Sequence, residues 1–398
     1  MTSEPLSEPF GSGKVHTVMK IIIAPDSFKG SLTARQAADA ITAGVTRVIP
    51  DAECVAIPMS DGGEGTMRSL VDATGGSTVT RQVTGPLGIP VDAEYGILGD
   101  ERTAIIEMAS ASGIQHVDET TRNPLTATTY GTGELIRDAL DHGVTHIIVG
   151  LGGSATNDGG AGMAQALGAR LLDANGRDLP HGGAALADLA DIDCSNIDTR
   201  LKTVTIRLAC DVNNPLTGPR GASRVFGPQK GATEAMTERL DHALAHYAAV
   251  VRERLGREIE TVPGAGAAGG LGAGLLAFAD ASMSSGVELV VEATGLKKKA
   301  MGAQWCLTGE GGIDAQTQYG KTPMGVARAV HEVSPECRVV ALAGSIGNGA
   351  ERLYELGFDA IFGIMPGVAT MREAIDQAAV NLERTAENVA RLIVAAQR

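Results

Sequence analysis

The length, composition and charge of the chain exclude several classes of protein. Its 398 residues suffice for two or three domains with substantial cores, and 43% apolar with 20% charged residues is ordinary for a soluble globular enzyme. A net charge of −14 argues against binding nucleic acid or an anionic membrane through the general surface, and 3% aromatic residues leave few rings for base stacking. A small anionic substrate would therefore need a local basic pocket.

The ends of the chain and the cysteines favour a cytoplasmic location. Residues 1–18 are polar and without pattern, which predicts a disordered extension. The N-terminus lacks the apolar core of a signal peptide, and no apolar run approaches the length of a membrane span. The five cysteines form no CxxC pair, as expected in a reducing compartment.

The first ordered segment predicts a β-α-β-α unit. Lys20–Ala24 is a short β-branched run typical of a buried parallel strand, Thr33 opens an amphipathic helix, and Cys54–Ile57 is a second strand. A polar loop follows each strand, as expected where a parallel sheet binds a ligand at its carboxyl edge. These loops carry Asp26, Ser27 and Lys29 after the first strand, and Asp61 and Glu64 after the second.

The pattern changes near Ser77. Three short alternating runs joined by turns predict antiparallel strands at Thr78–Val83, Val91–Ile97 and Thr103–Met108. Further strands are expected at His146–Val149 and Val204–Ala209, with helices at Ala161–Leu167 and Thr233–Leu255.

The β-α-β-α rhythm returns at the end of the chain. Strands are expected at Trp305–Thr308, Arg338–Leu342 and Ala360–Ile364, with helices between and after them. Two strands at the front and three at the back suit one five-stranded doubly wound parallel sheet. We therefore predict an α/β protein in which a Rossmann-like domain, residues 19–76 plus 302–398, is interrupted by an inserted α/β domain, residues 77–301.

The most concentrated polar loop is Gly150–Gly162, between a predicted strand and a predicted helix. Glycine lets the backbone come close to a ligand, and the free amides of a helix start attract anions. Four polar side chains in five positions exceed what a structural turn needs, which favours a binding loop. The residues expected to bind phosphate or nucleotide are Gly152, Gly153, Ser154, Thr156 and Asn157.

The same loop permits another reading. Gly150–Ala155 fits the G-x-G-x-x-G/A dinucleotide pattern, with Asp173 at a suitable distance downstream, so an NAD-dependent oxidoreductase of a small hydroxy acid is an alternative. Gly264–Gly269 fits the pattern too but lacks a convincing strand before it. The Walker A pattern fails because Ala315 stands where its first glycine must be. A non-catalytic sensor of sugar acids is a third possibility.

Several charged residues are candidates for chemistry. Asp61 and Glu64 could bind magnesium through oxygen or could cap the next helix, and Glu310 stands in a similar loop with Lys321 nearby. Asp211 ends a buried strand, where it is either a turn-former or a general base. Two weaker candidates for holding an anionic substrate are Arg122 and Lys230, each of which is more often a surface charge.

The chain as a whole resembles the bacterial glycerate kinases. The resemblance runs from about Met19 to Gly367 and rests on long motifs in the right order. It implies an ATP- and magnesium-dependent kinase acting on D-glycerate, with position 2 favoured, and a Rossmann-like domain with an insertion. The motifs begin at Asp26 (DSFKGSL), Asp61 (DGGEGT), Ala127 (ATTYGTGE), Gly152 (GGSATNDGG), Ala209 (ACDV), Val225 (VFGPQKGA), Pro263 (PGAGAAGGL) and Thr308 (TGEG).

Residues and resemblance together predict a phosphoryl-transfer site between two domains. We expect Asp211 or Asp158 as the base, with Lys29 also catalytic, and magnesium at Asp61, Glu64 or Glu310. Substrate binding is assigned to Asp26, Ser27, Arg122 and Lys321, with Lys29 a further candidate for the substrate carboxylate. Two departures from the family pattern are Gly312, where arginine is usual, and the pair Gln304-Trp305.

Overall fold

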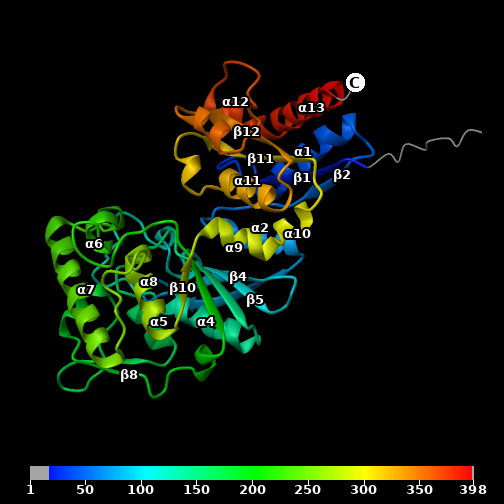
Figure 1. The fold of residues 1–398 in the computed structure, drawn as a ribbon. Coiled ribbons are helices and arrows are strands. Elements are labelled where there is room, and N and C mark those ends of the chain that lie inside the picture. Colours follow the sequence, from blue (N-terminus) through cyan, green and yellow to red (C-terminus); the bar gives the residue numbers. More distant parts are fainter. Residues whose placement is uncertain (1–17, 397–398) are drawn as a thin grey trace, which may run out of the picture.

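The computed structural model describes residues 18–396 and contains two large sheets (Figure 1). Most of the predicted N-terminal extension lies outside the described residues. No helix among residues 18–396 is both long and apolar enough to cross a membrane.

The first sheet has the five parallel strands predicted from the front and back of the sequence. Their order in the structure is β13-β12-β11-β1-β2. The chain leaves β1 toward β2 and returns on the other side at β11, so the strand order reverses between β1 and β11. Ligands bind at such switch points in doubly wound sheets. The strands are β1 (Lys20–Pro25), β2 (Glu53–Ala56), β11 (Trp305–Ile313), β12 (Arg338–Ile346) and β13 (Ala360–Gly363).

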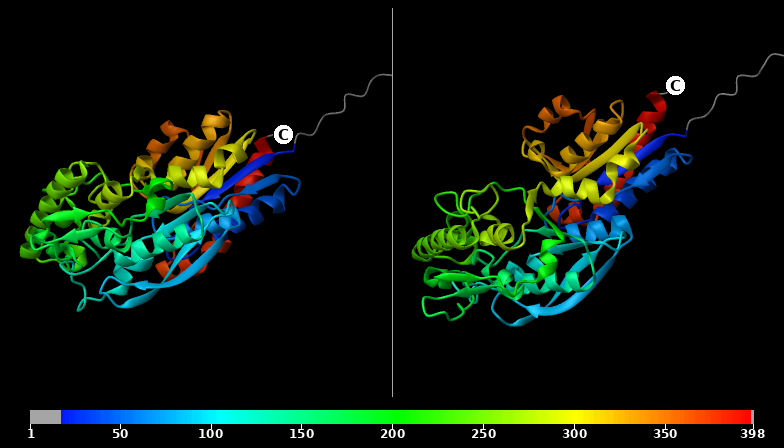
Figure 2. Two further views of the ribbon diagram at one scale, coloured as in Figure 1. Left: turned by 90° about the horizontal axis from the view of Figure 1, so that it is seen from below. Right: turned by 60° about the horizontal axis from the view of Figure 1, so that its bottom comes forward.

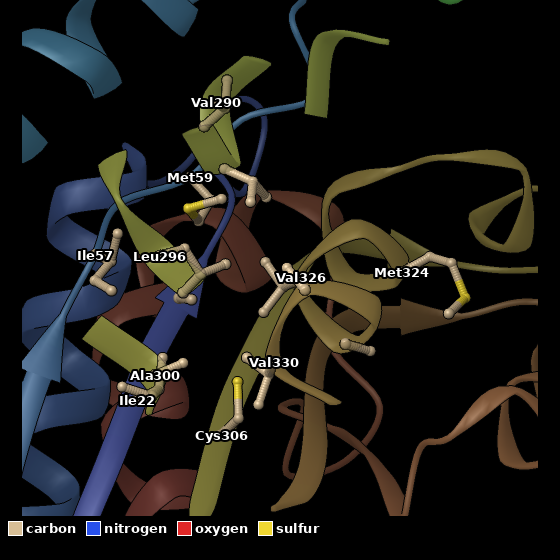
Figure 3. Packing of buried hydrophobic residues seen from close by; sticks show 14 of the residues in the cluster. Ile22, Ile57, Met59, Val290, Leu296, Ala300, Cys306, Met324, Val326 and Val330 are labelled. Carbon is tan, nitrogen blue, oxygen red and sulfur yellow. The ribbon is translucent and has the colours of Figure 1, made fainter. Parts of the chain in front are cut away.

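Helices cover both faces of this sheet because its central strands carry apolar side chains on both faces. Ile21 and Ile23 of β1 belong to a buried cluster with α1 (Ala34–Val48) and α13 (Ala378–Ala396). Ile22 between them points the other way, into a cluster that includes Val290, Leu296 and Val326 (Figure 3). The other helices of this half are α2 (Thr66–Thr74), α11 (Thr322–Val333) and α12 (Met371–Asp376).

The second sheet has six strands in the order β10-β9-β6-β5-β4-β3. The predicted antiparallel strands are present, but β5 is antiparallel only to β4 and runs parallel to β6. Four neighbouring strands are therefore parallel, and their carboxyl ends share one edge. The strands are β3 (Ser77–Thr84), β4 (Pro90–Ile97), β5 (Thr103–Glu107), β6 (His146–Gly150), β9 (Thr205–Ala209) and β10 (Ser282–Ser284).

Helices and a small hairpin complete this half, with β7 (Arg170–Leu172) pairing antiparallel to β8 (Asp191–Asp193). Its helices are α3 (Ala109–Ser112), α4 (Tyr130–Asp141), α5 (Ala161–Ala166), α6 (Ala222–Phe226), α7 (Glu234–Leu255) and α8 (Ala267–Phe278).

Two helices lie at the junction of the halves: α9 (Gly286–Thr294) and α10 (Leu296–Ala300). Val290 and Leu296 belong to the same buried cluster as Ile22 of β1, and Figure 1 places both helices beside α2 and α11. The two further views of Figure 2 show the halves joined along this seam. Because α9 and α10 pack on the first sheet, the chain returns to that half at about residue 285. The domain boundary expected from the sequence lies later, at residue 301.

The α1–α13 contact generates the first prediction. Gly44 of α1 is buried where a Cβ would lie 2.2 Å from the carbonyl oxygen of Glu383 in α13. We expect Gly44→Ala to lower the free energy of unfolding by about 1–3 kcal/mol through overpacking, although alanine favours helix. Denaturant unfolding measures this, and Ala43→Leu, on the exposed side of α1, is the control. Equal stability of Gly44→Ala and wild type would contradict the tight packing.

Candidate active site

The carboxyl edges of the two sheets face each other across a cavity of about 280 Å³. The loop after β2 contributes Asp61, Gly62 and Gly63, and the loop after β9 contributes Cys210, Asp211 and Val212. The remaining walls come from Lys29 and from the loop after β6, Leu151 to Ser154. The predicted interdomain location of the site thus corresponds to a real cavity between the sheets.

Three carboxylates interact at the switch point of the first sheet: Asp26, Asp61 and Glu310. Asp26 follows β1, and it accepts hydrogen bonds from the Ser27 amide at 2.6 Å and from the Thr322 hydroxyl. Burial raises the pKa of Asp26 to about 6, with the Thr322 hydrogen bond opposing and the charge of Asp61 adding. Burial raises the pKa of Glu310 to about 7, where Lys321 opposes and Asp26 and Asp61 add. These carboxylates therefore form one electrostatically coupled group.

Lys321 is paired with carboxylates of its own sheet edge. Its Nζ lies 3.6 Å from Glu310 Oε1 and 3.9 Å from Asp314 Oδ1, and it donates to the Gly312 carbonyl at 3.3 Å. Glu310 also accepts from the Thr317 hydroxyl at 3.1 Å. Lys321 is thus a cation beside Gly312, and its carboxylate partners are Glu310 and Asp314.

Asp61 and Glu64 lie in one loop but face different spaces. Asp61 lines the interdomain cavity, whereas Glu64 is exposed and lines two neighbouring hollows. Within residues 18–396, no group of three or more His, Cys, Asp or Glu side chains is arranged to hold a metal ion by itself. Any metal would therefore need ligands from substrate or water besides these carboxylates.

Lys29 is the exposed cation of the cavity. A tight turn presents it: the Phe28 amide donates to the Leu32 carbonyl at 2.9 Å, and the Leu32 amide donates back at 3.0 Å. Gly30 next to it has φ of +80°, a conformation that favours glycine. Within the described residues, the Lys29 ammonium makes no hydrogen bond or ion pair that would compete for an anion.

Asp211 lies on the cavity wall opposite the first sheet. Its Oδ1 accepts the Gly286 amide at the start of α9 at 3.1 Å. Burial raises the pKa of Asp211, the Gly286 hydrogen bond opposes this, and the charge of Asp61 adds. Asp211 thus binds the first amide of α9, and its carboxylate also lines the cavity, where it can meet a ligand.

Asp158, the other candidate base, is fully buried beneath the central loop. It accepts hydrogen bonds from the Thr129 amide and hydroxyl at 2.8 and 2.9 Å and from the Gly160 and Gly162 amides at 3.1 and 3.2 Å. Burial raises its pKa, and these hydrogen bonds oppose the shift. Its oxygens have no access to a substrate, so the geometry favours a structural role over the catalytic one.

This arrangement also corrects the expectation of an anion site at the helix start. The Gly160 and Gly162 amides at the start of α5 are bonded to Asp158 and the Met163 amide to the Thr129 hydroxyl, so they are not free for phosphate. Thr156 and Asn157 are fully buried, and the side-chain amide of Asn157 (Nδ2) donates to Ser223 Oγ at 2.9 Å. Only Gly152, Gly153 and Ser154 of the predicted phosphate group line the cavity.

Lys230 is a buried residue of the cavity wall and not the surface charge that its sequence context suggests. Its Nζ is buried and donates to Ser154 Oγ at 2.6 Å and to the Thr156 carbonyl at 2.7 Å. Burial lowers its pKa to about 7, and the charge of Asp158 opposes the shift. Arg122 binds the backbone next to Lys230, because its guanidinium donates to the Gln229 carbonyl at 3.2 Å. Arg122 does not line the cavity, and neither does Lys321.

Comparison with known proteins decides the family. The model of the glycerate kinase family matches residues 21–394. The chain belongs to the glycerate kinase family. It is 54% identical to a glycerate kinase of Halalkalibacterium halodurans over 370 residues, covering 93% of this chain and 97% of that protein. It is 49% identical to a glycerate 2-kinase of Escherichia coli over 380 residues, covering 96% and 99%.

A solved structure agrees. A crystal structure assigned to a glycerate kinase 2 from Salmonella typhimurium LT2 superimposes with a TM-score of 0.89 at 50% identity, covering 96% of this chain and 100% of that one. The predicted fold class and family resemblance are therefore both confirmed.

In this member of the glycerate kinase family, the dinucleotide-like pattern has a structural explanation. The amides at the start of α5 are taken by Asp158. The downstream acid, Asp173, holds a surface turn by accepting from the Asn175 amide at 2.8 Å and from Arg177. Gly269 of the second match is packed so closely that a Cβ would lie 2.0 Å from the Thr156 carbonyl oxygen. Neither match is arranged to bind a dinucleotide.

The buried carboxylate generates the second prediction. Asp158→Asn replaces acceptors with an amide that cannot serve all four donors, so we expect a loss of about 2–4 kcal/mol in the free energy of unfolding. Asp188→Asn, on the exposed surface, is the matched control. Denaturant unfolding compares the two. An Asp158→Asn protein as stable as wild type would contradict the structural role.

Proposed function

We propose that this protein transfers the γ-phosphoryl group of ATP to D-glycerate, with Mg²⁺, at the interdomain cavity, and that the product is 2-phosphoglycerate. Membership of the family and the names of its relatives support the reaction, and the glycerate 2-kinase of Escherichia coli supports the position. The observation that carries the site is the meeting of an unpaired cation, Lys29, with Asp61 and Asp211 in one cavity. Such chemistry depends on positioning and charge stabilisation more than on covalent steps.

The cavity suits the reacting end of the substrates. A volume of about 280 Å³ lies just below the usual range for whole small-molecule sites, roughly 300–1,000 Å³. It can hold glycerate and the phosphoryl group but not the whole nucleotide. Lys29 would attract the anionic groups, and the backbone at Gly152 and Gly153 lets a phosphate approach without side-chain obstruction.

Asp61 is the carboxylate best placed to hold magnesium. It lines the cavity, and its charge acts on Asp26, Glu310 and Asp211. Mg²⁺ typically uses one or two carboxylates together with phosphate oxygens and waters, which fits a site without a complete protein cage. When bound, it would neutralise charge on the phosphate oxygens. Glu310 is a weaker candidate because Lys321 and Thr317 already engage it.

Asp211 is our proposed base. Its raised pKa makes it a better proton acceptor than an ordinary carboxylate, and its hydrogen bond to the Gly286 amide fixes its position. The hydroxyl of glycerate, at the carbon next to the carboxylate, would give its proton to the Asp211 carboxylate as the phosphoryl group arrives.

The reaction itself is directly testable. Incubating the purified protein with ATP, Mg²⁺ and D-glycerate should yield one phosphorylated product. Proton–phosphorus correlation NMR shows whether phosphorus couples to the C2 proton, as we expect, or to the C3 protons. Formation of NADH from NAD and glycerate, without ATP consumption, would instead identify the oxidoreductase alternative.

Asp211→Asn should lower turnover by about 10² to 10⁴ while leaving nucleotide affinity near normal. Asparagine keeps the shape and can still accept the Gly286 amide, so the loss would report the missing base. Raising the magnesium concentration should not restore the rate. The control is Asp280→Asn, an exposed position. Rescue by excess metal would show that Asp211 is a metal ligand.

Asp61→Asn should raise the magnesium concentration needed for half-maximal rate by at least about tenfold, since even outer-shell partners of a metal matter by 10–100-fold. Glu64→Gln is the matched comparison, because Glu64 lies in the same loop but faces away from the cavity. Magnesium titrations of both variants decide between them. A larger shift in Glu64→Gln would move the metal site to the other side of the loop.

A further inference from the structure

An apolar groove of about 410 Å³ lies at the carboxyl ends of β11, β12 and β13. Its walls are the segment after β13 and helix α12, with Ile364, Met365, Val368, Met371 and Ile375. Val368, Met371 and Ile375 are exposed. Exposed apolar side chains gathered in one hollow mark a binding surface more often than a solvated one.

Two glycines, Gly311 and Gly344, line the groove where β11 and β12 lie side by side. At Gly344, a Cβ would lie 2.6 Å from the Gly311 carbonyl oxygen, so adjacent strands β11 and β12 present bare backbone there. At Gly311, a Cβ would make an ordinary contact with the Lys29 amide at 3.4 Å, so this position adjoins the turn that carries Lys29. Phe28 of that turn lines the groove as well. Apolar walls, together with two glycine positions that carry no side chain, suit an apolar ring.

Lys29 connects the groove with the reaction site. It lines both the apolar groove and the interdomain cavity that contains Asp61 and Asp211. A ligand that occupies both must be extended, apolar and flat at one end and anionic at the other. A nucleoside triphosphate has this chemistry, and the unpaired ammonium of Lys29 lies between its two ends.

We propose that the groove of Phe28, Val368, Met371 and Ala374 binds the nucleobase of the nucleoside triphosphate. The inference rests on the proposed kinase function. It places the base beside β12 and the segment after β13, and the phosphates over Lys29, pointing to Asp61. The groove and the cavity together hold what the cavity alone is too small to hold.

The test fills the groove. Ala374→Phe puts a ring into it, and Ala379→Phe puts the same ring on exposed surface outside it. Calorimetry measures the dissociation constants of ADP, AMP and tripolyphosphate, which carries the anionic end without a base. In Ala374→Phe we expect ADP and AMP to bind at least about tenfold more weakly, a change of about 1.4 kcal/mol, and tripolyphosphate to bind as in wild type. The KM for ATP should rise and that for glycerate should not.

The outcomes separate this inference from the function on which it rests. A wild-type protein that does not phosphorylate glycerate contradicts the proposed function, whatever the groove binds. A wild type that phosphorylates glycerate, with unchanged ADP affinity in Ala374→Phe, contradicts the nucleobase site alone. Equal losses for ADP and tripolyphosphate would also overturn it, because the damage would then lie at the phosphates. If Ala374→Phe changes only the oligomeric state in size-exclusion chromatography, a second copy of the chain covers the groove.

Discussion

The buried carboxylate of Asp158 is the constraint on which the central loop depends. A charged group without access to water is tolerated only when hydrogen bonds and an opposite charge compensate it. Thr129 and the amides of Gly160 and Gly162 supply the hydrogen bonds, and Lys230 supplies the charge. Lys230 in turn donates to Ser154, so this wall of the cavity is held by a buried hydrogen-bond network that includes both side chains.

The two halves are held together at the reaction site itself. At Gly62, a Cβ would lie 2.6 Å from Gly286 Cα, so the backbones of the loop after β2 and the start of α9 touch. Glu107 of β5 accepts the Met67 amide at 2.8 Å and so caps α2, whose N-cap is a glycine. Each half therefore positions a loop of the other. Asp61 and Asp211 owe their shared cavity to these contacts.

The sequence was sufficient for the fold class, the family and the five-stranded sheet, because the signals for these are local strand runs and long motifs. It could not assign the roles of individual polar residues in Gly150–Gly162. Ligand-binding loops and loops that hold a buried carboxylate have the same composition, since both need donors and glycines. Only three-dimensional burial separates Asp158 and Asn157, which face inward, from Ser154, which lines the cavity.

The burial of Lys230 could not be predicted from the sequence either. In the sequence it resembles a surface lysine after a Gly-Pro turn, and nothing local indicates that its ammonium is enclosed. Its partners, Ser154 and Thr156, are more than seventy positions away in the chain. Contacts of that range follow from the packing of α6, η4 (Pro228–Lys230) and the central loop, which no periodicity predicts.

Ionisation of the buried carboxylates at the switch point destabilises the folded protein, and a bound cation would reduce this destabilisation. Between the ordinary pKa values of 3.8 and 4.5 and the raised values of about 6 and 7, the unfolded chain releases protons that folded Asp26 and Glu310 keep. Ionisation therefore lowers the stability of the folded state as the pH rises through this window. Lys321 offsets only part of this cost because it interacts with Glu310 and Asp314 and not with Asp61. Negative charge held close together in this way attracts a cation, so the destabilised edge is also the place where a metal would gain most by binding.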